Sequence, residues 1–187
     1  LAALAVGHVL NIDMEKAGRA LRDHTAPPGR MNVLAGVHGS CIIDDTYNSS
    51  PVAATEALLA LRDITVAGRK ILVLGDMLEL GAHYQTEHEK LGKRRTEIAS
   101  EIYTVGPRSK WTYNAALEAG FDKNNLFWFD DSADAGHVLA ERLQAGDIVL
   151  VKGSQGIRME KTVAVIMAEP ERAKDLLVRQ EEAWENR

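Results

Sequence analysis

The chain has 187 residues, which is enough for one α/β domain with a core of its own. Its formal net charge of −5 argues against a nucleic-acid surface. No apolar run approaches the ~20 residues of a membrane span, and no signal-peptide pattern opens the chain. The single cysteine, Cys41, cannot form an internal disulfide, so we expect a reducing, cytoplasmic compartment and a buried, inert thiol.

The first residues indicate a helix whose beginning is expected to lie before residue 1. Residues 1–10 are mostly apolar and lack a capping residue, which predicts that the chain is a piece of a longer protein. Asp13 can cap a second helix over residues 14–23. Two prolines and a glycine at residues 27–29 end that helix and form a stiff joint. We therefore expect a domain boundary between residues 26 and 27.

After the joint, strand patterns and helix patterns alternate. The strands are expected at residues 31–37, 40–45, 71–74, 101–105, 126–129 and 147–152. The helices are expected at residues 51–64, 84–100, 111–119, 131–144 and 157–167, with a charged helical tail from residue 170. From residue 42 onward the strands begin roughly 20 to 30 residues apart, as in β–α–β units. The pattern predicts an α/β fold with a mostly parallel sheet flanked by helices.

The loops that follow parallel strands share one edge of a sheet, where ligands bind in this fold class. The first such loop follows Asp44 and Asp45 and ends at Ser50 and Pro51, which suit the N-cap and first position of a helix. The carboxylates could hold Mg²⁺ or a ribose hydroxyl, and strand alternation predicts that one of them points into the structure.

Two further loops at this edge carry glycines. Gly75 suggests a close approach of backbone, and Asp76 with Glu79 either accepts from an ammonium or, as we favour, caps the next helix. Residues 153–156 form a glycine-bracketed turn between a strand and a helix, and Lys152 and Arg158 add positive charge. Such a turn can receive a carboxylate or a phosphate, and the alternative is an ordinary tight turn.

Two other clusters favour a structural interpretation. The spacing of His83, Glu87 and His88 does not place both imidazoles with a third ligand on one helix face, so no metal site is expected. The basic residues 93–95 lie in a polar helical stretch with several glutamates, which is typical of a solvated helix face rather than of an RNA site.

Four segments together resemble the Mur ligase family, most closely its D-alanyl-D-alanine-adding branch. They are residues 28–31, 43–48, 73–81 and 151–161. The resemblance covers nearly the whole chain. It implies that residues 27–187 are a Rossmann-like C-terminal domain that binds the incoming substrate. It also implies that residues 1–26 are the helical end of the central ATPase domain of that family.

The resemblance implies an ATP-dependent amide-forming ligase of peptidoglycan precursor synthesis, and hence of cell-wall biogenesis, cell shape and cell division. In that family ATP phosphorylates the terminal carboxylate of a UDP-N-acetylmuramoyl-tripeptide, and the amine of D-alanyl-D-alanine attacks the acyl phosphate. ATP and Mg²⁺ are bound mainly by the central domain, whose phosphate loop is absent from this sequence. We therefore expect these 187 residues to be inactive without the N-terminal and central domains.

The resemblance also assigns residues to two sites, residue by residue, and assigns neither a catalytic residue nor a metal ligand. The expected nucleotide-binding residues are Arg30, Asp45, Tyr47 and Asn48. The expected substrate-binding residues are Asp76, Lys152, Ser154, Gln155 and Arg158. Two positions depart from the family pattern: Ser50 stands where the family usually has Asn, and Gln155 where it has Arg, which removes a fixed charge from the proposed anion loop.

Two other functions remain open from the residues. One is a fragment of another Mur-like ligase, either one that adds a different amino acid or folylpolyglutamate synthase. The other is a non-catalytic Rossmann-like binding module, which a full gene lacking the upstream phosphate loop would favour. The ligase interpretation requires Asp45, Asp76 and Ser154 to lie along one edge of the sheet.

Overall fold

The computed structural model describes residues 2–22, 26–93 and 98–184. Within them one sheet has the strand order β1-β2-β6-β3-β4-β5. The strands are β1 (Asn32–Ala35), β2 (Cys41–Asp45), β3 (Lys70–Gly75), β4 (Glu101–Val105), β5 (Leu126–Phe129) and β6 (Ile148–Lys152). The strands β2 to β6 pair in parallel, and β1 pairs antiparallel with β2. The predicted α/β fold with a mostly parallel sheet is confirmed.

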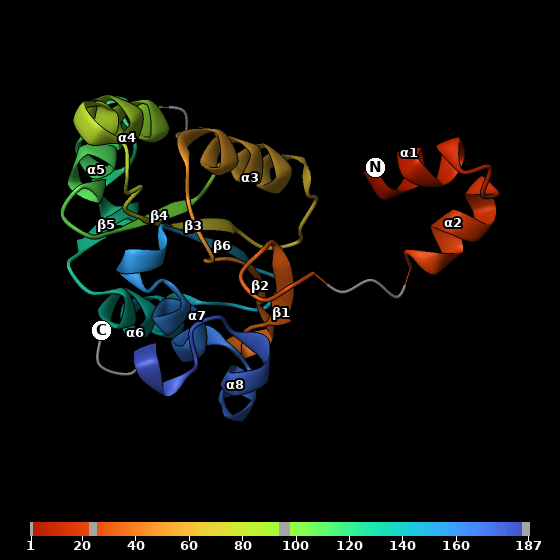
Figure 1. The fold of residues 1–187 in the computed structure, drawn as a ribbon. Helices are drawn as coiled ribbons and strands as arrows, with labels where there is room; N and C mark the ends of the chain where they lie inside the picture. Colours follow the sequence, from red (N-terminus) through yellow and green to blue (C-terminus); the bar gives the residue numbers. More distant parts are fainter. Residues whose placement is uncertain (1, 23–25, 94–97, 185–187) are drawn as a thin grey trace.

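Helices cover both faces of this sheet (Figure 1). The helices α3 (Pro51–Asp63), α4 (Tyr84–Lys93) and α5 (Ser109–Glu118) lie on one face. The helices α6 (Ser132–Arg142), α7 (Glu160–Ile166) and the short α8 (Ala173–Leu176) lie on the other. After β5 the chain crosses to the other face of the sheet through α6. The next strand, β6, then lies between β2 and β3.

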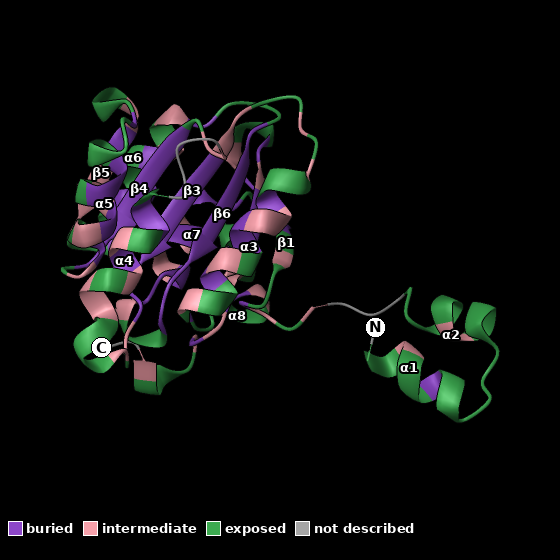
Figure 2. Ribbon diagram, turned by 90° about the horizontal axis from the view of Figure 1, so that it is seen from above, coloured by how far each residue is buried: buried purple, intermediate pink, exposed green. Residues whose placement is uncertain are grey.

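The apolar strands form the core because both of their faces are covered. In β3, Ile71 and Val73 pack with α6 and α7, whereas Leu72 and Leu74 pack with α3, α4 and α5. Successive side chains of a strand point to opposite faces, so a continuous apolar run fills two cores at once. Figure 2 shows the central strands buried and the outer helix faces exposed.

The N-terminal residues form the helices α1 (Ala2–Val9) and α2 (Met14–Ala20). Asp13 caps α2, as predicted, because its side chain accepts a hydrogen bond from the backbone of Lys16 (2.9 Å). Figure 1 shows this helix pair apart from the sheet. The domain boundary between residues 26 and 27 stays a prediction. No helix among the described residues is long and apolar enough to cross a membrane.

Several predicted elements were too long, and the structure explains three of them. The strand expected to reach residue 37 ends at Ala35, because His38 has a left-handed φ of 56° and the chain turns into β2. The helix expected over residues 84–100 ends, as described, at Lys93. Residues 94–97 lie outside the described part, and Ser100 already donates to the carbonyl of Lys70 beside β3 (2.8 Å).

The third overlong element was the helix expected from residue 157. It begins only at Glu160, because Arg158 has a left-handed φ of 57° that a helix cannot contain. The tail from residue 170 was expected to be one charged helix. Within its described residues it holds only the four-residue α8 and two single 3₁₀ turns, and Arg179 again has a positive φ of 58°.

Candidate functional site at the carboxyl ends of the strands

Three loops meet at the carboxyl ends of β2, β6 and β3. The strands are neighbours, with Asp45 in register with Lys152 and Lys152 in register with Leu74. Ser154 joins the three loops. Its N–H donates to the carbonyl of Asp76 (2.8 Å), its hydroxyl donates to the carbonyl of Ser49 (3.1 Å), and its oxygen accepts from the N–H of Leu78 (2.9 Å). The predicted meeting of Asp45, Asp76 and Ser154 at one edge is confirmed.

Two glycines allow this close approach. A Cβ at Gly153 would lie 2.5 Å from Cγ of Met159 and 3.0 Å from Cα of Gly75. A Cβ at Gly75 would lie 2.7 Å from Sδ of the same methionine. All three distances are shorter than van der Waals contact, so the two loops can pack against Met159 only because Gly75 and Gly153 have no side chain. The close backbone approach predicted at Gly75 is confirmed.

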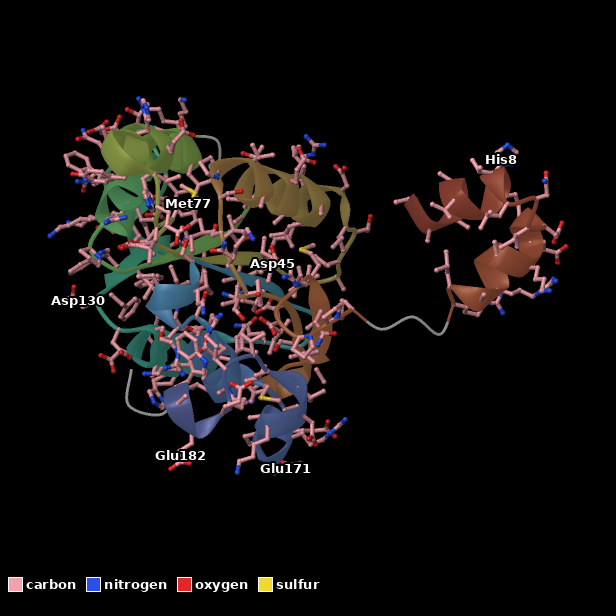
Figure 3. All side chains as sticks on the ribbon, in the orientation of Figure 1. His8, Asp45, Met77, Asp130, Glu171 and Glu182 are labelled. Carbon is pink, nitrogen blue, oxygen red and sulfur yellow. The ribbon has the colours of Figure 1, made fainter. Side chains whose placement is uncertain are left out.

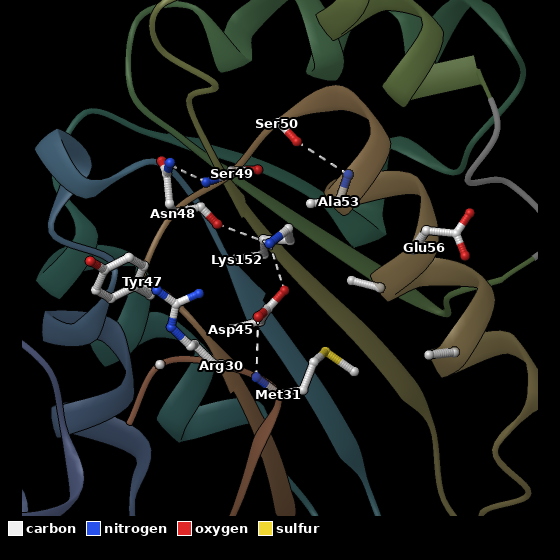
Figure 4. A pocket seen from close by; sticks show the side chains of 13 residues that line it. Arg30, Met31, Asp45, Tyr47, Asn48, Ser49, Ser50, Ala53, Glu56 and Lys152 are labelled. Carbon is white, nitrogen blue, oxygen red and sulfur yellow. Dashed lines mark hydrogen bonds and ion pairs between the residues drawn. The ribbon is translucent and has the colours of Figure 1, made fainter. Parts of the chain in front are cut away.

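A pocket of about 520 Å³ opens between the joint, the β2 loop and the start of α3 (Figure 4). All four residues expected to bind a nucleotide line it, namely Arg30, Asp45, Tyr47 and Asn48. The guanidinium carbon of Arg30 lies 3.9 Å from the centre of the Tyr47 ring, a cation–π arrangement. The ring is 45% exposed, so this pair forms an open wall that a planar ligand can reach. We call this cavity the joint pocket.

An ion pair forms the floor of the joint pocket. The ammonium of Lys152 lies 2.5 Å from Oδ2 of Asp45 and donates to the carbonyl of Asn48 (3.0 Å). The N–H of Met31 donates to Oδ1 of Asp45 (3.1 Å). Lys152 is almost fully buried, so the carboxylate balances a charge that would otherwise be costly. Within the described chain, Arg30 has no ion pair and supplies the exposed positive charge of the pocket.

Strand alternation predicted that one of the two aspartates points into the structure, and that residue is Asp44. Its carboxylate accepts from the N–H of Gly29 (3.0 Å) and from the N–H (3.2 Å) and hydroxyl (2.6 Å) of Thr46. Burial raises the pKa of Asp44 above its ordinary value. This carboxyl therefore ties the joint to the end of β2, while Asp45 faces the pocket.

The expected substrate-binding residues divide between two cavities. Lys152 lines the joint pocket, whereas Ser154, Gln155 and Arg158 line a second cavity of about 370 Å³, which also contacts Asn48. We call it the turn pocket. Arg158 is held there by Glu160 and by the carbonyl of Trp184. Gln155 is exposed and lines this cavity, at the position where the family resemblance indicates a lost charge.

Asp76 lines neither pocket. It is buried, and its two oxygens accept from the N–H groups of Ser109 (2.6 Å) and Arg108 (3.2 Å). Burial raises the pKa of Asp76 above its ordinary value. The capping interpretation was right, but the helix is α5, which follows β4, and not the next helix. Its geometry leaves no carboxylate oxygen facing a cavity, which argues against the expected role in substrate binding.

His88 contacts the loop that follows β3, which also contains Asp76. Its Nε2 accepts from the N–H of Met77 (3.1 Å), which assigns the ring proton to Nδ1, where it faces the hydroxyl of Thr112 (2.9 Å). Burial lowers the pKa of His88 to about 4, so the ring is neutral at pH 7. Figure 3 shows Met77 and Asp45 within the body of the domain. Among the described residues, no three metal-ligating side chains gather.

Sequence reasoning missed one part of the site, namely the C-terminal segment. Residues 177–184 line a further cavity beside Arg30 and Tyr47, contribute Trp184 to the turn pocket, and bring Arg179 against the β2 loop. The signal available in the sequence was the apolar pair Leu177 and Val178 directly before that arginine. An apolar pair within a charged tail indicates a segment that docks rather than one that is solvated.

The fold is a Rossmann-like α/β domain whose candidate site lies at the carboxyl ends of its parallel strands. The family model described as "Mur ligase, glutamate ligase domain" matches residues 29–155. The chain belongs to the Mur ligase family.

Among its relatives are ligases named UDP-N-acetylmuramoyl-tripeptide–D-alanyl-D-alanine ligase. The protein of Bacillus subtilis is 29% identical over 171 residues, which are 91% of this chain and 37% of that protein. The protein of Escherichia coli is 30% identical over 168 residues, which are 88% of this chain and 35% of that protein. The chain thus spans about a third of the length of these relatives.

Two solved structures of Mur-like ligases are similar to this chain. The MurF ligase from Thermotoga maritima in complex with ADP has a TM-score of 0.71 and 30% identity, covering 92% of this chain and 37% of that one. The folylpolyglutamate synthase of the same organism has a TM-score of 0.52 and 19% identity, covering 81% of this chain and 33% of that one. The second likeness shows the shared fold alone.

Proposed function

We propose that this chain is the C-terminal part of an ATP-dependent, cytoplasmic ligase that joins D-alanyl-D-alanine to a UDP-N-acetylmuramoyl-tripeptide through an acyl phosphate. The product would serve peptidoglycan precursor synthesis. The observation that carries the proposal is the joint pocket, where Arg30, Asp45, Tyr47 and Asn48 converge in a chain similar to ligases of that name. In this proposal α1 and α2 are the end of the central ATPase domain.

The joint pocket suits the nucleoside part of ATP. Both oxygens of Asp45 already accept one hydrogen bond, yet each carboxylate oxygen has a second lone pair for a ribose hydroxyl. The ring of Tyr47 with Arg30 above it offers an aromatic surface and a positive charge. The proposal assigns Mg²⁺ and the transferred phosphate to the central domain. The residues of this chain bind and orient the nucleotide and exclude water from one side.

The turn pocket suits the incoming dipeptide. The exposed Gln155 lines it together with Ser154 and Gly156 of the same turn. Arg158 adds positive charge, although its guanidinium is already tied to Glu160. We propose that the carboxylate of the dipeptide binds here, so that its amine points toward the joint pocket. Asn48 lines both cavities and stands between the two substrates.

The test of the overall proposal uses the full-length gene product that contains this chain. With UDP-N-acetylmuramoyl-tripeptide and ATP, D-alanyl-D-alanine should release ADP, whereas single amino acids including glutamate should not. The 187 residues alone should release none. Detectable turnover by this chain alone, or a preference for glutamate in the full-length protein, would overturn the proposal.

The nucleotide assignment is tested by Asp45→Asn, which keeps the shape but removes the charge. The KM for ATP should rise at least tenfold, about 1.4 kcal/mol, because a neutral amide is a weaker acceptor for ribose hydroxyls. Asp63→Asn, at the exposed end of α3, is the matched control and should leave that KM unchanged. An unchanged KM for Asp45→Asn removes this residue from the nucleotide site.

The dipeptide assignment is tested by Gln155→Ala and by Gln155→Arg, which restores the usual family residue. Loss of the amide should raise the KM for the dipeptide several-fold, and the arginine should lower it below that of the wild type, because it returns a fixed positive charge. Gln155 is the better probe than Ser154 or Arg158, since both of these also hold loops together. Equal dipeptide KM values for all three proteins would remove the dipeptide from the turn pocket.

A further inference from the structure

Residues 177–184 form a segment that packs against the β2 loop, and we call this segment the strap. At its centre, Nη2 of Arg179 donates to the carbonyl of Thr46 (2.6 Å) and Nη1 donates to the carbonyl of Tyr47 (3.1 Å). These carbonyls belong to the two residues that follow Asp45. The guanidinium is nearly fully buried, so it holds the backbone of the loop and not its side chains.

A buried carboxylate orients this arginine. Oε2 of Glu160 accepts from Nε (3.1 Å) and Nη2 (2.8 Å) of Arg179, while its Oε1 pairs with Nε of Arg158. Glu160 is the first residue of α7 and is 1% exposed. The cluster therefore connects the loop after β2, the loop after β6 and the strap. Buried ion pairs add little net stability, and fixing one arrangement of neighbouring segments is their better-attested use.

The strap also holds the other wall of the joint pocket. Val178 packs over Gly29, where an added Cβ would lie 2.9 Å from Cγ1 of Val178 and 2.9 Å from the backbone nitrogen of Tyr47. The N–H of Tyr47 donates to the carbonyl of Gly29 (2.9 Å). The joint, the β2 loop and the strap thus pack against one another.

The backbone of the strap carries strain at the residue that makes these contacts. Arg179 has a φ of 58°, a left-handed conformation that costs a non-glycine residue about 1 kcal/mol or more. Such a conformation persists where the surroundings impose it. Here the surroundings are Leu177, which is buried in the core, and the three acceptors of the guanidinium.

We propose that Arg179 is a positioning residue for the nucleotide site: it fixes the backbone of Thr46 and Tyr47, and so sets the Tyr47 ring beneath Arg30. The assignment of a nucleotide to this site depends on the proposed function. The role of Arg179 in fixing the loop does not depend on it. The family model ends at residue 155, so the strap lies outside the matched segment. No bond is made or broken in this role; Arg179 acts through the loop and touches no substrate.

The first test measures the loop directly in the 187-residue chain. Hydrogen–deuterium exchange is followed in peptides that cover residues 44–50, with β3 and β4 as internal references. Arg179→Ala should speed exchange at the amides of Thr46 and Tyr47 about tenfold and leave the reference strands unchanged. Arg172→Ala is the matched control, because this exposed arginine of the same tail pairs only with Glu169 among the described residues.

A second variant keeps this test decisive if Arg179→Ala fails to fold. Arg179→Lys retains the charge beside Glu160, but an ammonium cannot bridge two carbonyls and a carboxylate as a guanidinium does. It should show faster exchange over residues 44–50 with a smaller increase than alanine. Wild-type exchange there in the lysine variant, or equal acceleration in all strands of either variant, would overturn the positioning role.

The second test uses the full-length ligase. Arg179→Ala should raise the KM for ATP about tenfold and leave the KM for the UDP-N-acetylmuramoyl-tripeptide unchanged, with Arg179→Lys between it and the wild type. Faster loop exchange with an unchanged KM for ATP would overturn the link to the nucleotide. An inactive wild-type ligase would overturn the proposed function instead, and the exchange experiment would still decide the role of Arg179 in the loop.

Discussion

Charged side chains are buried at both ends of the parallel strands, but their hydrogen-bond partners differ between the two ends. At the amino ends of the strands, Arg69 pairs with Asp147 (2.6 Å) and Glu101 (2.5 Å), and Arg142 pairs with Glu101 (3.0 Å). Each carboxylate there has a guanidinium partner. At the carboxyl ends, Asp44 and Asp76 are held by backbone N–H groups and a hydroxyl, and Arg30 rests on an aromatic ring beside a pocket.

The difference shows in the pKa values. Burial pushes the pKa of Asp147 up, but hydrogen bonds from Arg69 and Gln144 outweigh it, so this pKa lies below its ordinary value. At the other edge, burial prevails and raises the pKa of Asp44 and of Asp76. The amino-end network therefore closes the fold with arginine–carboxylate pairs. At the carboxyl ends, Asp44 and Asp76 hold loops together, while Arg30 and Asp45 line the joint pocket.

The largest effect is expected from breaking the amino-end network. Glu101→Ala leaves Arg69 and Arg142 without their shared carboxylate and should lower the free energy of unfolding by about 3 kcal/mol, the low end for a buried pair because both arginines are partly exposed. Urea unfolding followed by circular dichroism measures it. The exposed pair of Arg62 and Asp63 gives the control, since Asp63→Ala should cause no measurable change. Equal losses in both variants would erase the contrast between buried and exposed pairs.

The next effect concerns pH and the carboxyl-end edge. His88 has a folded pKa of about 4 and an ordinary value of 6.5, so below pH 6.5 the unfolded chain takes up a proton that the folded chain does not. The stability that neutral His88 provides is complete above pH 6.5 and is lost as the pH falls toward 4. Between pH 7 and pH 5 the loss should be about 2 kcal/mol.

Urea unfolding at pH 7, 6 and 5 measures this slope, with His88→Gln as the comparison. The glutamine cannot titrate, so its profile should be flatter across that range. The raised pKa values of Asp44 and Asp76 act with the opposite sign in both proteins and cancel in the difference. Identical slopes for the two proteins would mean that the imidazole does not control the acid stability of this edge.

A smaller effect is expected where the loops touch. Gly153→Ala places a methyl group 2.5 Å from Cγ of Met159, so that side chain must move and the free energy of unfolding should fall by about 1 to 2 kcal/mol. Gly18→Ala, in α2 with nothing within 4 Å of the added carbon, should cause no loss. Wild-type stability for Gly153→Ala would show that the three loops are not packed as tightly as the geometry requires.

The smallest effect is expected at the start of α3. The hydroxyl of Ser50 accepts from the N–H of Ala53 at 3.3 Å, so Ser50→Ala should cost about 0.5 to 1 kcal/mol. Ser50→Asn restores the usual family residue and should be as stable as the wild type, because both side chains are good N-caps. A loss for asparagine equal to that for alanine would show that the side chain does not act as a cap.

The sequence predicted the central strands and the edge at which the site lies. The run from Ile71 to Leu74 is apolar without interruption, as expected of a strand covered on both faces. The bounds were less accurate where one backbone angle decided them. Arg158 and His38 interrupt regular structure by a positive φ, which neither residue type signals by itself.

The sequence by itself determined the local chemistry: the cap at Ser50, the inward direction of one carboxylate of the pair Asp44 and Asp45, and the glycines at which backbones meet. Tertiary structure alone decided which groups share a cavity. Asp76 caps a helix more than 30 residues away, and Arg179 reaches a loop 132 residues before it. The reason is physical. Hydrogen-bond acceptors are satisfied by whatever donor the fold brings near, and a single sequence does not show distances between remote segments.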